Sequence, residues 1–398
     1  MPFATSRRAA VVLAALAPIV GGLVACTSSG TGSGADGGTA GKAGAAADPH
    51  VANVTITAAK GCELNTTKFS AGGITFKIDN KDATAVSEVE LLSGERILGE
   101  KENIAAGLAA EFAVNVGAGT YTLYCPGATT EKTRIDVTGK AVAVDDSVAA
   151  LVKQGTAAYK SYVDNQIGYF VTATEKLNRA LSGTDLKAAQ AAYIAARPFY
   201  EKIEPVAESF VNGTQNLDAD IDARANDVPA SQWRGYHRIE KALFEDKTLS
   251  GTAKWGRLLI ADVLTLQQKA KSLTYKAPDL ANGAQGLLDE IASTKITGEE
   301  ERYSHIDVVD MANNVEGSEQ AFADLKPALM KIDATLASTI STEFVALDKV
   351  VDAYRTQDNA SGYVLYTTLT DADRRTLSAA VKAVAEPMSR VAGKVADA

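Results

Sequence analysis

In the first part of the chain, hydrophobic and polar positions alternate with the period of two that is expected of β-strands. Six short segments show this pattern, and Gly, Asp and Asn residues typical of turns separate them. Short strands at such spacing predict a β-sandwich over residues 50–140. The six segments are 54–56, 74–78, 88–91, 112–116, 121–124 and 134–137.

From residue 145 onward the pattern changes to the three- and four-residue spacing of helices, rich in Ala and Leu. Residues 149–170 and 336–354 each predict one long helix. Capping signals occur at 182–185 and 370–373. Several helices joined by polar loops predict an all-α bundle over residues 145–398. The fold class is therefore multidomain, with a β-sandwich followed by a helical bundle.

Residues 1–25 have the layout of a signal peptide. Arg7 and Arg8 precede an apolar or small-residue stretch that ends at Cys26. The segment Leu23–Cys26 resembles the bacterial lipobox, in which the cysteine is lipidated and becomes the new N-terminus. The alternative is an ordinary secretory signal in which Cys26 is incidental. Export by the general secretory route and by the twin-arginine route both stay open.

Residues 26–49 are mostly Gly, Ala, Ser and Thr, which predicts a flexible tether. Together with a lipid on Cys26, such a tether would hold a folded body at the outer face of the cytoplasmic membrane, in an extracytoplasmic or periplasmic location. Beyond the N-terminal segment, no apolar run is long enough to span a membrane.

The amino-acid composition limits the partners and the metal sites that this chain could have. The net charge is −9, from 40 Lys and Arg against 49 Asp and Glu, which disfavours nucleic acid as a partner and suits cationic ligands. Only three His, three Cys and four Met are available for sites that bind soft metals. This scarcity excludes most templates of metalloenzymes.

The segment 119–127 resembles the last strand of cupredoxins, in which a cysteine is followed by a histidine and a methionine. In this chain the methionines are at 1, 311, 330 and 388, and the histidine nearest the β region is His50. A blue-copper site needs two histidines, a cysteine and an axial methionine. A blue-copper electron carrier is therefore excluded.

Cys62 and Cys125 have two open interpretations. If Cys26 is lipidated, an even number of thiols remains in an exported protein, which favours a disulfide. The alternative is a site for copper or iron made of reduced thiols and carboxylates. Glu63, Glu88 and Glu90 are nearby candidates for that second site.

In the helical region the segment 200–208 carries Glu201, Glu204 and Glu208 at helical spacing, which predicts one acidic helix face. Glu204 and Glu208 form a like-charge pair four residues apart, which is unfavourable unless solvent or a cation offsets the repulsion. A bound metal would supply that cation. A solvated acidic face is the alternative.

The segment 233–244 places His237 and Glu240 three residues apart on a predicted helix, so that both can reach one ion. By itself the pair is weak, because a lone histidine is more often an ordinary core or surface residue. Two further acidic segments accompany it, 217–224 and 296–317. The second of these is expected to begin a helix that carries several acids, with a solvated helix start as the alternative.

Four segments in this order resemble the imelysin-type, HxxE-containing helical domain of EfeO-type proteins, the extracytoplasmic component of an elemental iron uptake system. They are 196–210, 220–228, 232–247 and 298–310. In the larger members of that family the helical domain follows a His-poor cupredoxin-like domain. The resemblance covers essentially all of the chain after the tether.

The resemblance implies a metal site in the helical domain, with Asp222 competing for the place of Asp218 and Glu299 for that of Glu300. It also implies a second metal site of Cys62, Glu88 and Cys125. One imidazole nitrogen among carboxylate oxygens suits Fe³⁺ or Fe²⁺. Copper in the cupredoxin-like domain, and zinc in vitro, stay open. The implied first site comprises His237, Glu240, Glu204, Glu201, Asp218 and Glu300.

The function implied is that of a membrane-anchored lipoprotein that captures iron and delivers it to an iron permease, with a haem peroxidase as a further partner. The alternative is a metal-dependent enzyme, either an HxxE metallopeptidase or a ferroxidase that uses the cupredoxin-like domain. A hydrolytic site needs an open metal position and a general base. No segment requires these, and no catalytic residue is assigned.

Overall fold

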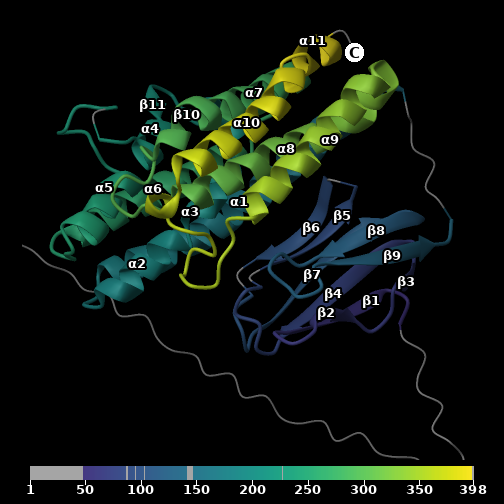
Figure 1. Ribbon diagram of the computed structural model, residues 1–398, viewed down its shortest axis with the longest axis horizontal. Helices are drawn as coiled ribbons and strands as arrows, with labels where there is room; N and C mark the ends of the chain where they lie inside the picture. The colour runs from purple at the N-terminus through teal and green to yellow at the C-terminus, as the bar shows by residue number, and fades with distance from the viewer. Residues whose placement is uncertain are drawn as a thin grey trace, which may run out of the picture. The chain divides into compact units, whose positions relative to one another are not determined.

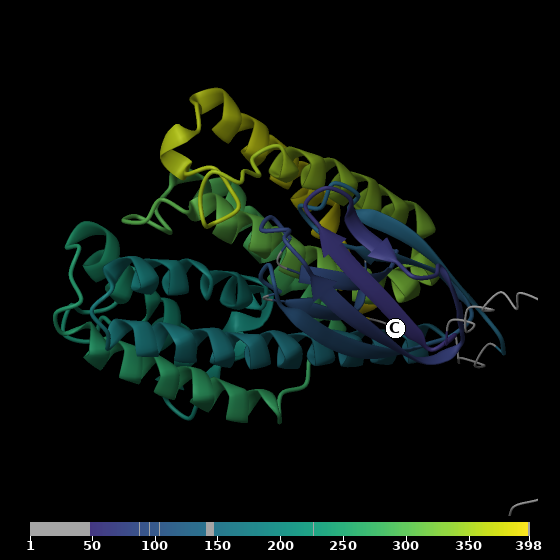
Figure 2. The same cartoon turned by 90° about the horizontal axis from the view of Figure 1, so that it is seen from below.

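The computed structural model describes residues 48–396 except 87, 95, 103, 141–146 and 226. The expected signal peptide, the lipid on Cys26 and nearly all of the expected tether lie outside the described residues. Figure 1 shows strands in the first described part of the chain, purple to blue, and mostly helices in the rest, and Figure 2 shows the same elements from below.

All six segments with alternating polarity form strands, within two sheets. In β1, the buried residues Ala52, Val54 and Ile56 alternate with more exposed ones. The first sheet has the order β2 (Gly61–Leu64), β1 (Val51–Thr57), β4 (Gly72–Asn80) and β7 (Ala109–Val116). The second has the order β3 (Lys68–Ser70), β9 (Lys132–Thr138), β8 (Gly119–Tyr124), β5 (Glu88–Ser93) and β6 (Arg96–Glu102).

Both sheets contribute to one apolar core, in which Phe76 stacks on Phe112 with ring centroids 4.9 Å apart. The β1–β4 and β3–β9 pairs are parallel, and the other pairs in the two sheets are antiparallel. The pattern did not predict β2, β3 and β6, of which β2 and β3 are too short to show an alternation. The cupredoxin-like fold stays a prediction.

The helical region begins with α1 (Val148–Leu181), which is longer than predicted because the buried stripe continues through Leu177 to Leu181. α9 (Ala334–Asp352) lies close to its predicted range. The remaining helices are α2 (Leu186–Ile194), α3 (Arg197–Glu201), α4 (Leu217–Asp222), α5 (Tyr236–Glu240), α6 (Thr252–Ala270), α7 (Ala277–Ser293), α8 (Asp307–Ile332), α10 (Asp371–Met388) and α11 (Val391–Val395).

Several short elements connect these helices. They are the 3₁₀ turns η1 (Glu204–Ser209), η3 (Lys295–Thr297) and η4 (Tyr366–Thr368), the π-helical turn η2 (Lys241–Glu245), and the hairpin of β10 (Val211–Asn212) and β11 (Gln215–Asn216). No helix among the described residues is long and apolar enough to cross a membrane.

The single acidic helix face predicted for residues 200–208 is wrong. α3 ends at Glu201 and η1 begins at Glu204, because a residue before proline disfavours the α conformation and Pro205 follows. Glu208 is exposed, whereas Glu201 is fully buried. Glu204 and Glu208 therefore do not form a like-charge pair four residues apart on one α-helix, and the repulsion expected for such a pair is absent.

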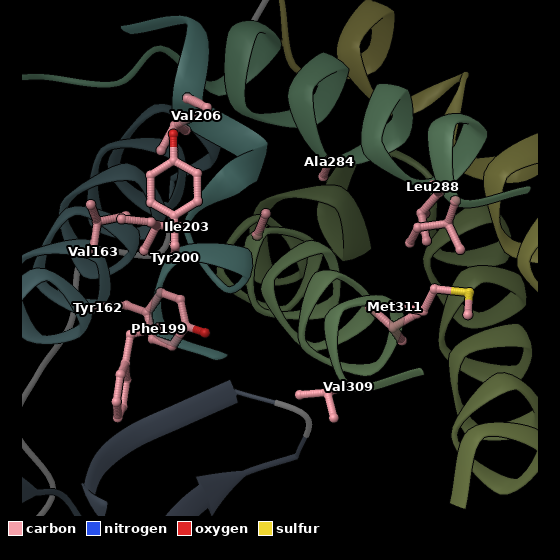
Figure 3. Packing of buried hydrophobic residues seen from close by; sticks show 14 of the residues in the cluster. Tyr162, Val163, Phe199, Tyr200, Ile203, Val206, Ala284, Leu288, Val309 and Met311 are labelled. Carbon is pink, nitrogen blue, oxygen red and sulfur yellow. The ribbon is translucent and has the colours of Figure 1, made fainter. Parts of the chain in front are cut away.

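Apolar packing holds the α3 segment in the core. Figure 3 shows Phe199, Tyr200 and Ile203 among the apolar side chains of the helical core, which also include Leu288 on α7 and Met311 on α8. Because these residues are buried, the polar side chains between them are carried into the interior as well. The site described next depends on this placement.

Candidate metal centre

His237 lies on the single turn of α5, and its imidazole is 2% exposed. Gly235 precedes the turn with φ of 87°, and a Cβ there would lie 2.2 Å from the carbonyl oxygen of Ile221. Only glycine permits this close approach of backbone to the end of α4. The approach brings Asp222, the last residue of α4, beside the imidazole.

The two nitrogens of His237 face different carboxylates. Nδ1 lies 3.2 Å from Oε2 of Glu240, and Nε2 lies 3.6 Å from both Oδ1 of Asp222 and Oε1 of Glu300. Nε2 is buried and has no hydrogen-bond partner among the described residues. A buried nitrogen between two carboxylates fits the donor set of a metal ion.

Glu240 is oriented by the backbone of the loop before α8. Its Oε1 accepts hydrogen bonds from the amides of Tyr303 and Ser304, each at 2.7 Å. Its other oxygen is thereby directed at His237. The expected helix start at the third acidic segment is displaced, because residues 298–306 form this loop and α8 begins only at Asp307.

The side chains around His237 form three overlapping groups, within each of which the potential ligand atoms all lie within 4.8 Å of one another. The groups draw on α3, α4, α5, α8 and the loop before α8. Carboxylates dominate them, which favours a hard cation. The groups are Asp222, His237 and Glu300; His237, Glu240 and Glu301; and Glu201, Glu300 and Asp310.

Two buried cations lie within this acidic cluster. Arg197 is fully buried, lies 3.0 Å from Glu301 and 2.9 Å from Asp310, and also contacts Glu201 and Asp222. Lys295 lies 2.7 Å from Glu204 and 3.3 Å from Glu201. The carboxylates outnumber Arg197 and Lys295, so the cluster keeps an affinity for further positive charge.

The pKa values of the buried groups reflect the opposing effects of burial and of neighbouring charges. Burial opposes protonation of His237, but Asp222, Glu240 and Glu300 outweigh it and raise the pKa of the imidazole well above its usual value. Burial alone would raise the pKa of Glu300, yet Lys295, His237 and Arg224 lower it well below the usual value. Burial raises the pKa of Glu301 and of Asp310.

Of the residues expected in the site, the structure brings Glu201, His237, Glu240 and Glu300 together. Glu204 adjoins them, since Asn314 donates to Oε2 of both Glu201 and Glu204, at 2.9 and 2.7 Å. Asp218 is outside the three groups and accepts a hydrogen bond from the Tyr200 hydroxyl. Asp222 occupies the place beside His237 instead.

Glu299, which was weighed against Glu300, is partly exposed, and its carboxylate lies 3.3 Å from Arg224. Several other site residues were not singled out from the sequence. Arg197 is four residues before Glu201, a spacing at which charges pair on a helix, and this was the signal that could have identified it. Three others lie within the recognised segment 298–310 without a pattern of their own, and Lys295 lies just before the acidic segment 296–317. The three are Glu301, Asp307 and Asp310.

In the β region Cys62 and Cys125 form a disulfide, and both residues are buried. A disulfide offers no thiolate to a metal, so this bond disfavours the thiolate alternative for the second site. Glu88, the third residue of that expected site, lies 3.4 Å from the ammonium group of Lys202.

The chain is similar to known proteins over most of its length. Residues 155–391 match the imelysin family model. The EfeO iron uptake system component of Escherichia coli K12 is 37% identical over 87% of this chain and 92% of its own length. That of Escherichia coli O1:K1 is 38% identical with the same coverage.

Among solved structures, an iron-regulated protein A precursor from Parabacteroides distasonis is 15% identical and covers 65% of this chain and 97% of its own. Its TM-score of 0.44 is too low to bear on the argument. The similarity to the EfeO proteins spans both the β region and the helical region, at an identity that establishes common descent. The chain therefore belongs to the family of the EfeO iron uptake system components, and its residues 155–391 are an imelysin domain.

Proposed function

We propose that this protein binds iron as cargo at the His237 centre and serves in iron uptake outside the cytoplasm. The observation that carries the proposal is the buried Nε2 of His237, which has no hydrogen-bond partner among the described residues and lies 3.6 Å from Asp222 and Glu300. The relatives are iron uptake components by name, which agrees with such a cargo.

The donor set favours iron over softer metals. Carboxylate oxygens surround one imidazole, and hard oxygen ligands suit Fe³⁺ and, with the nitrogen, Fe²⁺. The disulfide between Cys62 and Cys125 leaves no thiolate for copper or zinc in the β region. Iron is thus the metal that this proposal assigns to the protein.

The remainder of the proposal concerns how the cargo is handled. A lipid on Cys26 would anchor the protein at the outer face of the cytoplasmic membrane, and the cargo would pass to an iron permease with a haem peroxidase as a further partner. Mass spectrometry of the native N-terminus tests the anchor. A diacylated Cys26 is expected, and cleavage at any other bond would contradict it.

The iron site is tested by equilibrium dialysis of the purified protein against ferric nitrilotriacetate, with bound iron measured by mass spectrometry. We expect His237→Ala and Glu240→Gln each to lose iron from this centre, with affinity reduced at least about 100-fold. Glu299→Gln removes a charge from the partly exposed neighbour of Glu300 and is expected to change iron affinity little. Unchanged iron affinity in both ligand variants would refute the assignment.

A further inference from the structure

Lys295 lies inside the proposed iron centre, although its own side chain is a cation. It belongs to the short turn η3 and is 1% exposed. Its Nζ lies 2.7 Å from Oε2 of Glu204, 3.3 Å from Oε2 of Glu201 and 3.7 Å from Oε1 of Glu300. All three glutamates were expected from the sequence as metal ligands. A positive charge of the chain itself therefore occupies part of the expected ligand set.

Glu300 connects Lys295 to His237. Its Oε1 lies 3.7 Å from Nζ of Lys295 and 3.6 Å from Nε2 of His237. Since metal–carboxylate bonds are about 2 Å long, an ion bound to this oxygen would lie within about 6 Å of the ammonium group. In the interior, where solvent screens charges little, a ferrous or ferric ion at such a distance repels an ammonium group strongly. The ion and Lys295 would thus compete for the same oxygens.

Lys295 is charged in the protein without iron. Burial opposes the charge, but Glu201, Glu204 and Glu300 outweigh it and raise the pKa of the ammonium group well above its usual value. Buried carboxylates are costly when no cation or donor accompanies them. The ammonium group therefore stabilises the empty centre, at the expense of the attraction that the same carboxylates would exert on an ion.

The other buried cation of the centre, Arg197, is held more firmly. Its planar guanidinium group contacts several carboxylates at once, among them those of Glu301 and Asp310 at 3.0 and 2.9 Å, and it lies 5.4 Å from the ring centroid of Tyr236. Lys295 ends in a single ammonium group on a flexible four-carbon stem. Of these two cations, Lys295 is thus the one that can move aside when an ion binds.

Glu290 of α7 offers the ammonium group a second partner nearer to solvent. Its carboxylate is 39% exposed. The guanidinium group of Arg224 connects it to the centre, since it lies 3.9 Å from Glu290 and 2.9 Å from Glu300. The charge of Glu290 also contributes to the raised pKa of Lys295. An ammonium group that leaves Glu300 therefore keeps a carboxylate within its reach.

We propose that Lys295 is a built-in competitor of the cargo, whose ammonium group neutralises the empty centre, moves toward Glu290 when iron binds and favours release when it returns. The proposal rests on the iron-binding function proposed above and concerns how tightly that centre holds its ion. The centre exchanges one cation for another, so its buried carboxylates are neutralised both before and after binding. Without Lys295 the centre would hold iron more tightly and release it more slowly.

Lys295→Met tests the competition by removing the charge and keeping most of the stem. Wild type and variant are dialysed against ferric nitrilotriacetate at graded concentrations, and bound iron is measured by mass spectrometry. We expect Lys295→Met to bind iron at least about 10-fold more tightly, because a neighbouring positive charge is gone. Lys187→Met, at an exposed position on α2, is the matched control and should keep the wild-type affinity. A folded Lys295→Met protein that binds iron no more tightly than wild type would overturn the proposal.

A second measurement uses the wild-type protein and does not depend on the folding of that variant. N-hydroxysuccinimidyl acetate acetylates lysines that are accessible to solvent, and peptide mass spectrometry locates the modified residues. We expect Lys295 to be protected in the metal-free protein, where it is 1% exposed, and to lose this protection when iron is bound. Equal protection in the two states would refute the displacement.

Glu290→Gln removes the second partner of the ammonium group. Because a partly exposed ion pair contributes little, we expect iron affinity to fall only about 2- to 5-fold. Glu299→Gln is the matched control, since Glu299 is also a partly exposed partner of Arg224 and is expected to change iron affinity little. Equal affinities in the two variants would refute the part assigned to Glu290.

Two outcomes distinguish a failure of Lys295 as competitor from a failure of the iron centre. If iron binds to wild type and is lost in His237→Ala, while Lys295→Met keeps the wild-type affinity and Lys295 stays protected, the competitor is refuted and the function proposed above stands. If neither wild type nor Lys295→Met binds iron at the His237 centre, the proposed function is refuted, and the role of Lys295 with it.

Discussion

The two hydrophobic cores of this protein differ in the charged side chains that are buried in them. The β core is made of apolar side chains and the buried Cys62–Cys125 disulfide, and among the described residues of this region the buried polar ones are Asn80, Glu90 and Glu100. The helical core, by contrast, encloses a group of fully buried charged side chains. These include Arg197, Glu201, Glu240, Glu301, Asp307 and Asp310.

This difference bears on how each region gains its stability. Buried ion pairs contribute little net stability, because the free energy needed to desolvate the charges largely offsets their attraction. The buried charges of the helical core therefore add little to its stability, which agrees with the binding role proposed above. The β core gains stability from apolar burial and a covalent crosslink, and its described buried acids, Glu90 and Glu100, lie close to Glu316 of α8.

The most severe test of this contrast is Arg197→Met. The change leaves four buried carboxylates without their shared cation, and we expect it to lower the free energy of unfolding by about 5 kcal/mol. The four carboxylates are those of Glu201, Asp222, Glu301 and Asp310. Urea denaturation measures the loss. Saturating Fe³⁺ should restore part of it, because the ion replaces the lost charge.

Arg179→Met is the control for that change. Its side chain is 67% exposed and that of its partner Glu175 is 50% exposed, so solvent screens the pair and a loss below about 1 kcal/mol is expected. Equal losses in the two variants would show that burial of charge in the helical core has no special energetic role.

Cys62→Ser with Cys125→Ser tests the β core. The disulfide closes a loop with a sequence separation of 63, so its removal should cost about 4 kcal/mol through the entropy of the unfolded chain. Thermal unfolding measures the loss. Iron binding at His237 should persist in the folded variant, and its disappearance would show that the two cores act as one.

The raised pKa of Asp307 predicts a pH-dependent contribution to the stability of the helical core. Burial raises its pKa to about 6 from an ordinary value of 3.8. The folded state therefore binds this proton more tightly than the unfolded state, and the contribution of Asp307 to stability falls as pH rises from about 4 to 6. Asp307→Asn should remove this loss, so that at pH 7.5 it is more stable than wild type by up to about 3 kcal/mol. Urea denaturation at both pH values measures this, with equal stabilities expected at pH 4.

The smallest effect is expected at the surface of the bundle. Thr370 caps α10 by accepting a hydrogen bond from the Asp373 amide, while the Asp373 carboxylate accepts one from the Thr370 amide. Thr370→Ala should cost about 1 kcal/mol. Because the cap does not contact the His237 centre, iron affinity should stay unchanged. A parallel loss of iron affinity would mean that global stability, rather than local charge, controls binding.

Much of the architecture was predictable because it depends on local periodicity. Alternation indicated the strands, and the helical stripe of α1 simply continued further than expected. Prediction failed at residues 200–208, where spacing suggested one helix and Pro205 ended it. Short strands such as β3 carry too few residues to show a period.

The site was predictable in part for a related reason. His237 and Glu240 are neighbours on one helical turn, so their spacing in sequence determines their contact. The place of Asp222 beside His237 depends on the close approach of Gly235 to the end of α4. The resemblance implied Asp218 for that place with Asp222 as the competitor, and spacing along the chain contains no information that could decide between them.

By itself, then, the sequence determined the order of a β region and a helical region, the family, and the identity of the HxxE pair, because each depends on residues close together in the chain. Only the tertiary structure decided which carboxylates surround His237, that Arg197 and Lys295 lie among them, and that Glu316 meets Glu90 and Glu100. Those contacts join residues far apart in sequence, and they form only when apolar packing brings their elements together.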